Sequence, residues 1–302
     1  MRKALLSVGA ILAASAAMLP LVASAITVGP VRLEYNVNPG DTVSGSLFLE
    51  NEQTQEQTFY SSSQSFTETN GNRTFTTEAV GLPTWIHTSS SVTLAAGAQT
   101  EVPFTIDIPS DAPPGGQYAA IWWSTSPPPK GGGQFAVVSR AGILVYLQVS
   151  GNIKEAAQVT DLRAPASVFW TSSPMNIDMT FTDTGNTYLK PGGAVNMINI
   201  FGITQASAVV NPYGVDFLPQ APKGTQVQLD PPGFVLGPYR IQAAVTYGAN
   251  NNQTATETVW VWLFPWPVLT WLAVLIIFIF FVLPIGIRRY NRWIIAKSRN
   301  AS

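Results

Sequence analysis

The chain has 302 residues, of which 11% are charged, and it contains one histidine and no cysteine. All 17 acidic residues and nine of the 16 basic residues lie between Arg32 and Glu257, so this stretch has a formal net charge of −8. That charge argues against nucleic acid as a partner, and the lack of cysteine excludes thiol catalysis, cysteine metal ligands and redox switching.

The first 25 residues have the pattern of a secretory signal peptide. Met1-Arg2-Lys3 is a short positive segment, residues 4–21 are apolar, and Ala23-Ser24-Ala25 is a small-x-small cleavage pattern. We predict cleavage after Ala25, which would leave the chain from Ile26 onward outside the cytoplasmic membrane. An uncleaved N-terminal anchor is the alternative, but the small residues at the cleavage pattern favour removal.

Residues 26–263 have the alternation of β-strands. In 100–108 the apolar side chains alternate with polar ones at a period of two, and the same pattern returns in 175–181 and 239–247. Turn clusters rich in Gly, Pro and Asn separate these runs. We therefore predict an all-β fold of antiparallel β-sandwiches.

A degenerate internal repeat predicts two such sandwiches. Gly116-Gln117-Tyr118 and Gly237-Pro238-Tyr239 are 121 positions apart, and each follows an Asp that precedes a Pro. We expect a first domain over 26–150 and a second over 151–263, with each half ending in a similar pair of strands. Chance is the alternative, since Gly and Tyr are common where strands begin.

The adjacent pair Trp122-Trp123 is the most suggestive surface feature. Neighbouring residues of a strand point to opposite faces, so both rings cannot enter one core. An exposed ring beside the Pro- and Gly-rich segment 127–133 could stack on a sugar or anchor a protein, which makes Trp122 and Trp123 the candidate ligand-binding residues. The alternative is that the second ring is covered by packing. Trp85 and Trp170 are expected in the cores of their sandwiches.

A turn motif in the second half is interpreted as structural. Gly185 and Asn186 follow a strand and suit a turn with positive φ, and Pro191, Gly192 and Gly193 suit a second tight reversal. These residues are expected to hold a loop shape rather than contact a ligand.

Catalytic chemistry finds little support. His87 is the sole histidine, it lies in a strand-like run, and no Gly-x-Ser-x-Gly elbow is present. Acidic residues do not follow an EF-hand spacing, so no metal site is predicted, and no cofactor is implied. A pair of carboxylates for glycoside hydrolysis, which would come together only in the folded protein, stays an open alternative. We predict a protein that is not an enzyme.

A membrane span follows the second sandwich. Residues 267–287 carry no charge over 21 positions, enough to cross a hydrocarbon core of ~30 Å. Five basic residues follow within 288–302, and this bias predicts a cytoplasmic tail behind a helix over 264–287. Aromatic residues mark both interfaces, and Trp260 and Trp262 are expected in a last strand that lies almost directly on the bilayer.

Several turn and strand segments carry a family resemblance: Asn38-Pro39-Gly40 to Asn51, Pro109-Ser110-Asp111-Ala112 to Tyr118-Ala119-Ala120, Phe181 to Gly193 with Asp183-Thr184-Gly185-Asn186, Asn199-Ile200-Phe201-Gly202, Phe217-Leu218-Pro219, Gly237-Pro238-Tyr239 and Tyr247-Gly248. They resemble segments of the bacterial WxL-interacting cell-surface proteins. The similarity covers most of 27–263 and includes the order of signal, two immunoglobulin-like domains, span and basic tail. It implies a Gram-positive-type surface protein whose first domain contacts peptidoglycan and whose second binds another surface protein.

Three classes of function remain from the sequence. The first is a membrane-anchored surface protein whose sandwiches bind cell-wall polymer (peptidoglycan), another surface protein, or both. The second is a structural spacer subunit of an envelope assembly. The third, a wall-acting hydrolase, has the least support.

Overall fold

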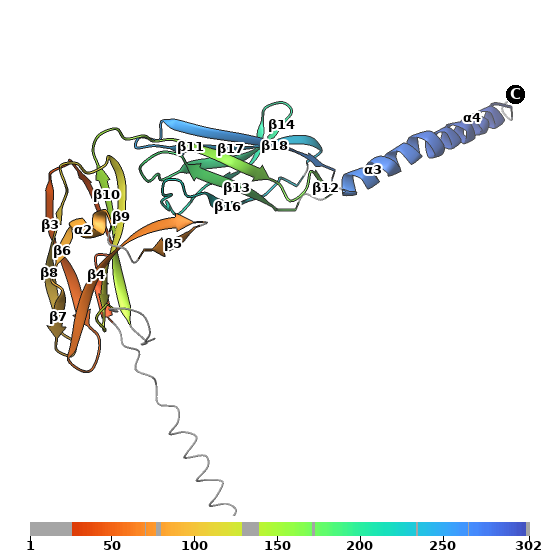
Figure 1. Cartoon of the computed structure of the whole chain (residues 1–302). Coiled ribbons are helices and arrows are strands. Elements are labelled where there is room, and N and C mark those ends of the chain that lie inside the picture. The colour runs from red at the N-terminus through yellow and green to blue at the C-terminus, as the bar shows by residue number, and fades with distance from the viewer. Residues whose placement is uncertain are drawn as a thin grey trace, which may run out of the picture. The chain divides into compact units, whose positions relative to one another are not determined.

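The computed structural model describes residues 26–69, 71–76, 80–128, 139–170, 173–233, 235–264 and 266–299 (Figure 1). The signal-peptide prediction falls outside these residues. The chain divides into two compact units, with the main division between Ser150 and Gly151, and the short segments 67–74 and 114–116 group with the second unit. We refer to the sandwich of β1–β10 as domain one and to that of β11–β18 as domain two.

Domain one is a sandwich of two sheets. The smaller sheet has the order β1 (Ile26–Gly29), β3 (Thr42–Asn51), β8 (Gln99–Asp107) and β6 (Ile86–Thr88). The larger has the order β2 (Arg32–Val37), β10 (Arg140–Val149), β9 (Gly115–Ser124), β4 (Gln57–Thr69) and β5 (Asn72–Phe75), with β7 (Ser91–Leu94) beside β4. A one-turn helix, α2 (Leu82–Trp85), precedes β6. The pairs β1–β3, β3–β8, β6–β8, β4–β7 and β4–β9 are antiparallel, and β10 pairs with β2 in parallel.

The predicted alternation builds the core of domain one. On β8, Val102, Phe104 and Ile106 are buried between the sheets while their neighbours face outward. Gly45 of the adjacent strand lies against Phe104, and a Cβ there would come within 2.7 Å of the ring. Trp85 belongs to the same core, as expected. Burial of this apolar face supplies most of the stability of such a sheet.

Domain two is a second sandwich. Its smaller sheet has the order β11 (Ala157–Arg163), β13 (Met175–Asp183) and β16 (Lys223–Leu229). Its larger sheet has the order β12 (Val168–Phe169), β18 (Gln253–Leu263), β17 (Gly237–Tyr247), β14 (Gly192–Asn199) and β15 (Thr204–Val209). One hydrophobic cluster fills the space between them, and all its members lie between Val159 and Leu263. The predicted architecture of two immunoglobulin-like sandwiches is confirmed.

The two Gly-x-Tyr segments begin comparable strands but place their tyrosines differently. Each precedes the last two strands of its domain, β9–β10 and β17–β18, which pair side by side. Tyr239 lies in the core of domain two, whereas Tyr118 packs on Phe66 and Tyr146 outside the core of domain one. Successive side chains of a strand point to opposite faces, so a difference of one residue in where a segment enters its strand is enough to put its tyrosine on the other face of the sheet.

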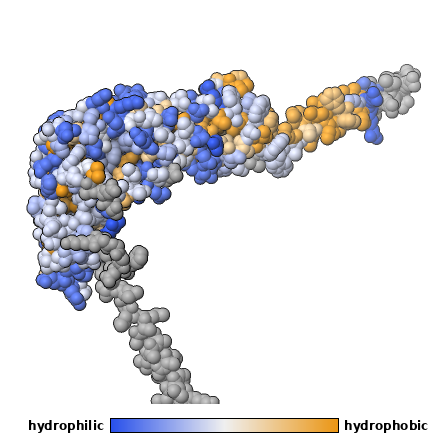
Figure 2. Space-filling view, in the orientation of Figure 1, coloured by the Kyte–Doolittle hydropathy of each residue, from blue (hydrophilic) through white to orange (hydrophobic). Residues whose placement is uncertain are grey.

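Domain two leads directly into a long apolar helix. β18 ends at Leu263, and the helix runs through α3 (Trp266–Ile277), the π-helical segment η1 (Phe278–Val282) and α4 (Leu283–Arg299). The stretch Leu269–Asn291, 23 residues with a mean hydropathy of 2.7, is long and apolar enough to cross a membrane, and none of it is buried against protein. Figure 2 shows this hydrophobic surface along the helix.

Candidate binding surfaces

Trp122 and Trp123 point to opposite faces of β9, as the alternation predicts. Trp123 is fully buried between the sheets with Leu49, Phe59 and Val102. Trp122 is half-buried on the outward face of the larger sheet. The core ring is therefore Trp123 and the outward ring is Trp122, while a role of either in ligand binding stays a prediction.

The ring of Trp122 is packed against neighbours on its own sheet. The guanidinium carbon of Arg140 lies 4.2 Å from its centroid, and Phe75 meets it edge-on at 4.9 Å between centroids. Gly142 lies beneath the indole, where a Cβ would come within 2.5 Å of two ring carbons. A sugar needs a ring face free for stacking, so this cover weakens the case for a carbohydrate platform here.

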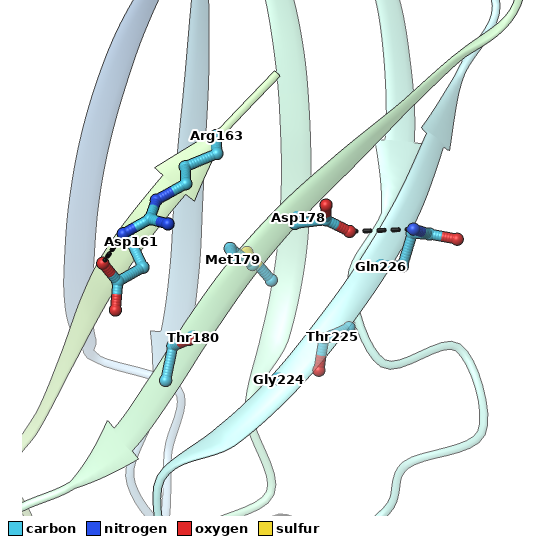
Figure 3. A pocket seen from close by; sticks show the side chains of 8 residues that line it. All are labelled: Asp161, Arg163, Asp178, Met179, Thr180, Gly224, Thr225 and Gln226. Atoms are coloured by element: carbon cyan, nitrogen blue, oxygen red, sulfur yellow. Dashed lines mark hydrogen bonds and ion pairs between the residues drawn. The ribbon is translucent and has the colours of Figure 1, made fainter. Parts of the chain in front are cut away.

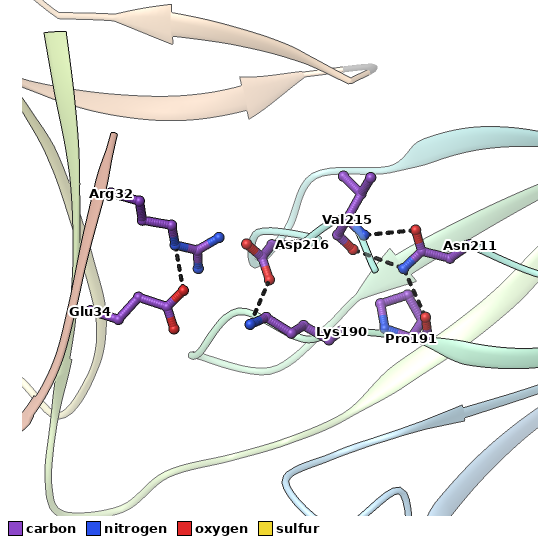
Figure 4. A network of polar contacts seen from close by, with 7 residues as sticks. All are labelled: Arg32, Glu34, Lys190, Pro191, Asn211, Val215 and Asp216. Carbon is purple, nitrogen blue, oxygen red and sulfur yellow. Dashed lines mark hydrogen bonds and ion pairs between the residues drawn. The ribbon is translucent and has the colours of Figure 1, made fainter. Parts of the chain in front are cut away.

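Trp122 belongs to a wider outward aromatic cluster, which consists of Phe66, Phe75, Tyr118, Trp122 and Tyr146. The Tyr118 and Tyr146 rings are 5.4 Å apart and the Phe66 and Tyr146 rings are 5.7 Å apart, in edge-to-face geometry. The guanidinium of Arg32 lies 3.7 Å from the Tyr146 centroid and pairs with Glu34 at 2.6 Å (Figure 4). Sequence reasoning singled out only Trp122, because the cluster joins four strands through long-range pairing.

Gly185 and Asn186 form a structural turn, but for a reason other than the predicted positive φ, which Gly185 does not have. A Cβ on Gly185 would come within 2.1 Å of the Lys154 carbonyl oxygen, so the close approach of that backbone requires glycine. The Asn186 side chain accepts a hydrogen bond from the Lys154 N–H at 2.8 Å and donates one to the Asn152 carbonyl at 2.9 Å. The turn thus holds the start of domain two.

Pro191 directly precedes β14, whose first two residues are Gly192 and Gly193, and Gly193 has a positive φ of 106°. A Cβ on Gly193 would come within 2.2 Å of the Ala244 carbonyl oxygen. The Pro191 carbonyl accepts a hydrogen bond from the Asn211 side chain at 2.8 Å (Figure 4). These residues fix a loop shape, and they also fasten the loop that follows β15.

That loop, residues 211–216, is held by its own side chains. Asn211 donates to the Val215 carbonyl at 2.9 Å and accepts from the Val215 N–H at 2.8 Å, which closes the turn. Lys190 lies 3.8 Å from the carboxylate of Asp216, whose side chain is buried (Figure 4). The loop projects Tyr213 into solvent, where the residue is 91% exposed.

A groove of about 660 Å³ lies between β15 and β16, and we refer to it as the edge groove. In the described part of domain two, β15 is the last strand of one sheet and β16 the last strand of the other. The loop with Tyr213 forms one end of the groove. Its lining consists of Ala208, Val209, Asn211, Pro212, Tyr213, Val215, Phe217, Lys223, Thr225, Gln226, Val227 and Gln228. Sequence reasoning missed this site, although Tyr213 in a Pro- and Gly-containing turn was a signal.

A second hollow of about 440 Å³ lies on the outward face of the smaller sheet of domain two (Figure 3). Its charged groups are paired: Arg163 contacts Asp161 at 2.7 Å, and Gln226 donates to Asp178 at 2.8 Å. The hollow is open and its charges are already satisfied, so its geometry does not suggest a reaction.

The structure adds no support for catalysis or metal binding in its described residues. His87 lies on β6 with 60% of its side chain exposed, and its Nε2 is 3.5 Å from the carboxylate of Asp107. No group of three or more His, Asp and Glu side chains is placed to hold a metal ion in the part of the chain that the structure describes.

Comparisons with known proteins give structural likenesses only. No protein-family model and no curated protein sequence matches the chain. The class 5 fimbriae chaperone CfaA is similar at 12% identity, with a TM-score of 0.41, over 78% of this chain and 98% of that one. The E. coli chaperone DraB is similar at 11% identity, with a TM-score of 0.35, over 78% and 98%. The CsuC–CsuE chaperone–adhesion subunit complex of Acinetobacter baumannii is similar at 9% identity, with a TM-score of 0.37, over 67% and 90%.

Proposed function

We propose that this protein is a single-pass membrane protein whose ectodomain binds another surface protein, and that the edge groove of domain two receives an extended segment of that partner. The apolar helix would anchor the chain, and the basic residues Arg288 and Arg289 near its end support a cytoplasmic tail with the sandwiches outside. The protein would act by binding rather than by catalysis, as a member of the WxL-interacting type that its sequence resembles.

One observation carries the proposal: a loop closed by side-chain hydrogen bonds presents Tyr213 in solvent beside two sheet edges. Folding gives no reason for such an exposed ring, because it buries no apolar surface in the domain. The side-chain bonds of Asn211 fix the loop before a partner arrives, which lowers the entropy cost of binding. Tyrosine is also among the residues enriched at protein interfaces.

The two edges define the chemistry of the occupant. An edge strand presents a row of backbone N–H and C=O groups that an added strand can satisfy. Exposed Val209 and Val215 supply apolar contact next to these groups. Backbone pairing combined with apolar side-chain contact suits an extended polypeptide better than a wall polymer, and the covered ring of Trp122 offers the polymer no comparable platform.

Photo-crosslinking of the full-length protein in its own membranes tests the proposal. A benzoylphenylalanine residue replaces Val209 or Tyr213 in the groove, or Thr256 on the outward face of β18 as a matched exposed control. We expect both groove positions to form an adduct with the same polypeptide and the control to form none. Adducts of equal yield from Thr256, or adducts with glycan alone, contradict the proposal.

A substitution separates binding from folding. Tyr213→Ala removes an exposed ring, so the free energy of unfolding should change by no more than ~0.5 kcal/mol. Because a central interface tyrosine contributes strongly, the yield of adduct from Val209 should fall at least about tenfold. In parallel, Trp122→Ala should leave retention on purified peptidoglycan unchanged. A loss of retention in that variant would favour the wall polymer as the ligand of domain one.

A further inference from the structure

The end of domain two from which the helix leaves carries most of the exposed apolar side chains of that domain. The sheet register sets which residues share this end: Asn199 of β14 lies level with Tyr239 of β17, which lies level with Val261 of β18. The turn between β14 and β15 therefore projects from the same end of the sheet as Trp262 and Leu263, where the chain leaves the sheet for the helix. We refer to residues 200–203 as the apolar tip.

The apolar tip is hydrophobic and highly exposed. Ile200, Phe201 and Ile203 have 62%, 80% and 57% of their surface open to solvent, and none of them belongs to the core cluster. The tip itself carries no charge. Such a group of apolar side chains costs solubility unless something covers it.

Three of the four backbone N–H groups of the apolar tip have hydrogen-bond partners. Oδ1 of Asn199 accepts hydrogen bonds from the N–H groups of Phe201 at 3.0 Å and Ile203 at 2.9 Å. The Gly202 N–H donates to the Asn199 carbonyl at 3.0 Å. These bonds lower the cost of moving the turn from water into a less polar phase, because unpaired backbone groups are what makes that transfer expensive.

Aromatic residues surround the point where the helix begins. Trp260 and Trp262 are exposed on β18, and the Trp262 ring stacks on Phe264 with centroids 5.7 Å apart. Trp170, expected in the core, is instead 59% exposed and contacts Phe264 at 6.0 Å, because it follows β12, the edge strand that pairs with the end of β18. The Trp266 N–H donates to the Trp170 carbonyl at 3.0 Å, which fastens the first residue of α3 to the sheet.

The exposed large apolar side chains of domain two are unevenly distributed, and most of them lie at the end from which the helix leaves. In the described residues before the helix, the exposed large apolar side chains at the helix end are Val168, Trp170, Ile200, Phe201, Ile203, Leu236, Trp260 and Trp262. Those elsewhere are Val209, Tyr213 and Val215, which line the edge groove. Figure 2 shows hydrophobic side chains at the helix end of domain two as well as along the helix.

We propose that the apolar tip, together with these tryptophans, inserts into the interfacial layer of the lipid bilayer that the C-terminal helix crosses. The occupant of this surface is lipid. The surface is continuous with the membrane-spanning helix, and its Trp residues are of the type that prefers the headgroup level. The inserted turn would hold domain two against the membrane at a second point. The inference rests on the membrane anchorage proposed above and is independent of the edge groove.

Fluorescence quenching in the full-length protein tests the inference, and the absence of cysteine makes single labels possible. Ile200→Cys carries a bimane label in nanodiscs of phosphatidylcholine and phosphatidylglycerol, and nitroxides attached to the lipids act as quenchers. Tyr213→Cys is the exposed control on domain two, and Phe280→Cys reports insertion of the helix. We expect the label at 200 to be quenched at least about threefold more than that at 213, since an interfacial side chain lies ~5–10 Å deep.

A second variant tests whether the apolar side chains of the tip cause the quenching by lipid. The label at position 200 is combined with Phe201→Asp and Ile203→Asp, which places two charges on the tip without touching the core. Lipid quenching should then fall to the level seen at 213, while the circular dichroism melting curve stays unchanged. Equal quenching at 200 and 213 in the parent protein, or quenching that survives both Asp substitutions, overturns the inference. Protection from iodide without quenching by lipid nitroxide also overturns it, because the cover is then a protein. Unquenched Phe280→Cys would instead show that the anchorage had failed.

Discussion

The Gly185 N–H donates a hydrogen bond of 2.7 Å to Oδ1 of Asp183, and this carboxyl is completely buried in domain two. Burial raises the pKa of Asp183 to about 7, the bond from Gly185 acts in the opposite direction, and the nearby charge of Glu155 raises it further. Within the described residues Oδ2 has no hydrogen-bond partner. The aspartate that begins the turn motif is therefore a group that folding prefers to keep protonated.

This shift predicts that domain two loses stability as the pH rises. Between the ordinary pKa of 3.8 and about 7 the folded state binds more protons at Asp183 than the unfolded state, so the free energy of unfolding falls across that window. Asp183→Asn removes the ionisation and keeps an oxygen for the Gly185 N–H. From pH 5 to pH 8, the stability of the variant relative to the wild type should rise by a few kcal/mol, at most ~1.4 per pH unit.

Urea denaturation of the ectodomain 26–264 at the two pH values measures this difference. Asp178→Asn removes an exposed carboxyl from the same strand and is the matched control. If the Asp183 and Asp178 variants respond alike to pH, burial of the Asp183 carboxyl does not govern the effect.

Gly185 should not tolerate a side chain. Gly185→Ala would place a Cβ 2.1 Å from the Lys154 carbonyl oxygen, so the backbone must move apart and the free energy of unfolding should fall by ~1–3 kcal/mol. Gly224→Ala is the control, since nothing lies within 4 Å of its Cβ position and its φ is not positive. Thermal unfolding of both variants measures the contrast, and an equal loss in both would mean that the close approach is not the cause.

The two tryptophans of β9 should differ in their cost. Trp123→Ala leaves a cavity in the core and should lower the free energy of unfolding by ~3–5 kcal/mol. Trp122→Ala loses the contacts with Phe75 and Arg140 and should cost only ~1–2 kcal/mol. Guanidinium unfolding of domain one compares them. A cost for Trp122 as large as that for Trp123 would show that the outward cluster is a second core.

The two domains should fold separately. The hydrophobic clusters of domain one lie within 26–149, and that of domain two lies within 157–263, so neither core takes residues from the other half. Fragments 26–150 and 151–264 should each be soluble and unfold in one cooperative step, as circular dichroism melting would show. If each fragment alone lacks a transition while the joined ectodomain has one, the cores depend on each other.

Local periodicity was enough to predict much of this molecule. The alternation of Val102, Phe104 and Ile106 predicts β8 and its buried face, because a period of two is a property of each strand by itself. The uncharged run 267–287 predicts the helix, since span length depends only on rise per residue. That Trp122 and Trp123 point apart follows from the same local rule.

Tertiary packing decided what local patterns leave open. Only the pairing of β9 with β4 and β10 selects Trp123 as the core ring, and only the pairing of β12 with the end of β18 leaves Trp170 exposed. Gly185 is required by the Lys154 carbonyl, which lies 31 positions earlier in the chain, and not by its own φ. The edge groove and the apolar tip depend on which strands end each sheet and which turns share one end. These features depend on contacts between residues far apart in the chain, and such contacts cannot be read from local sequence patterns.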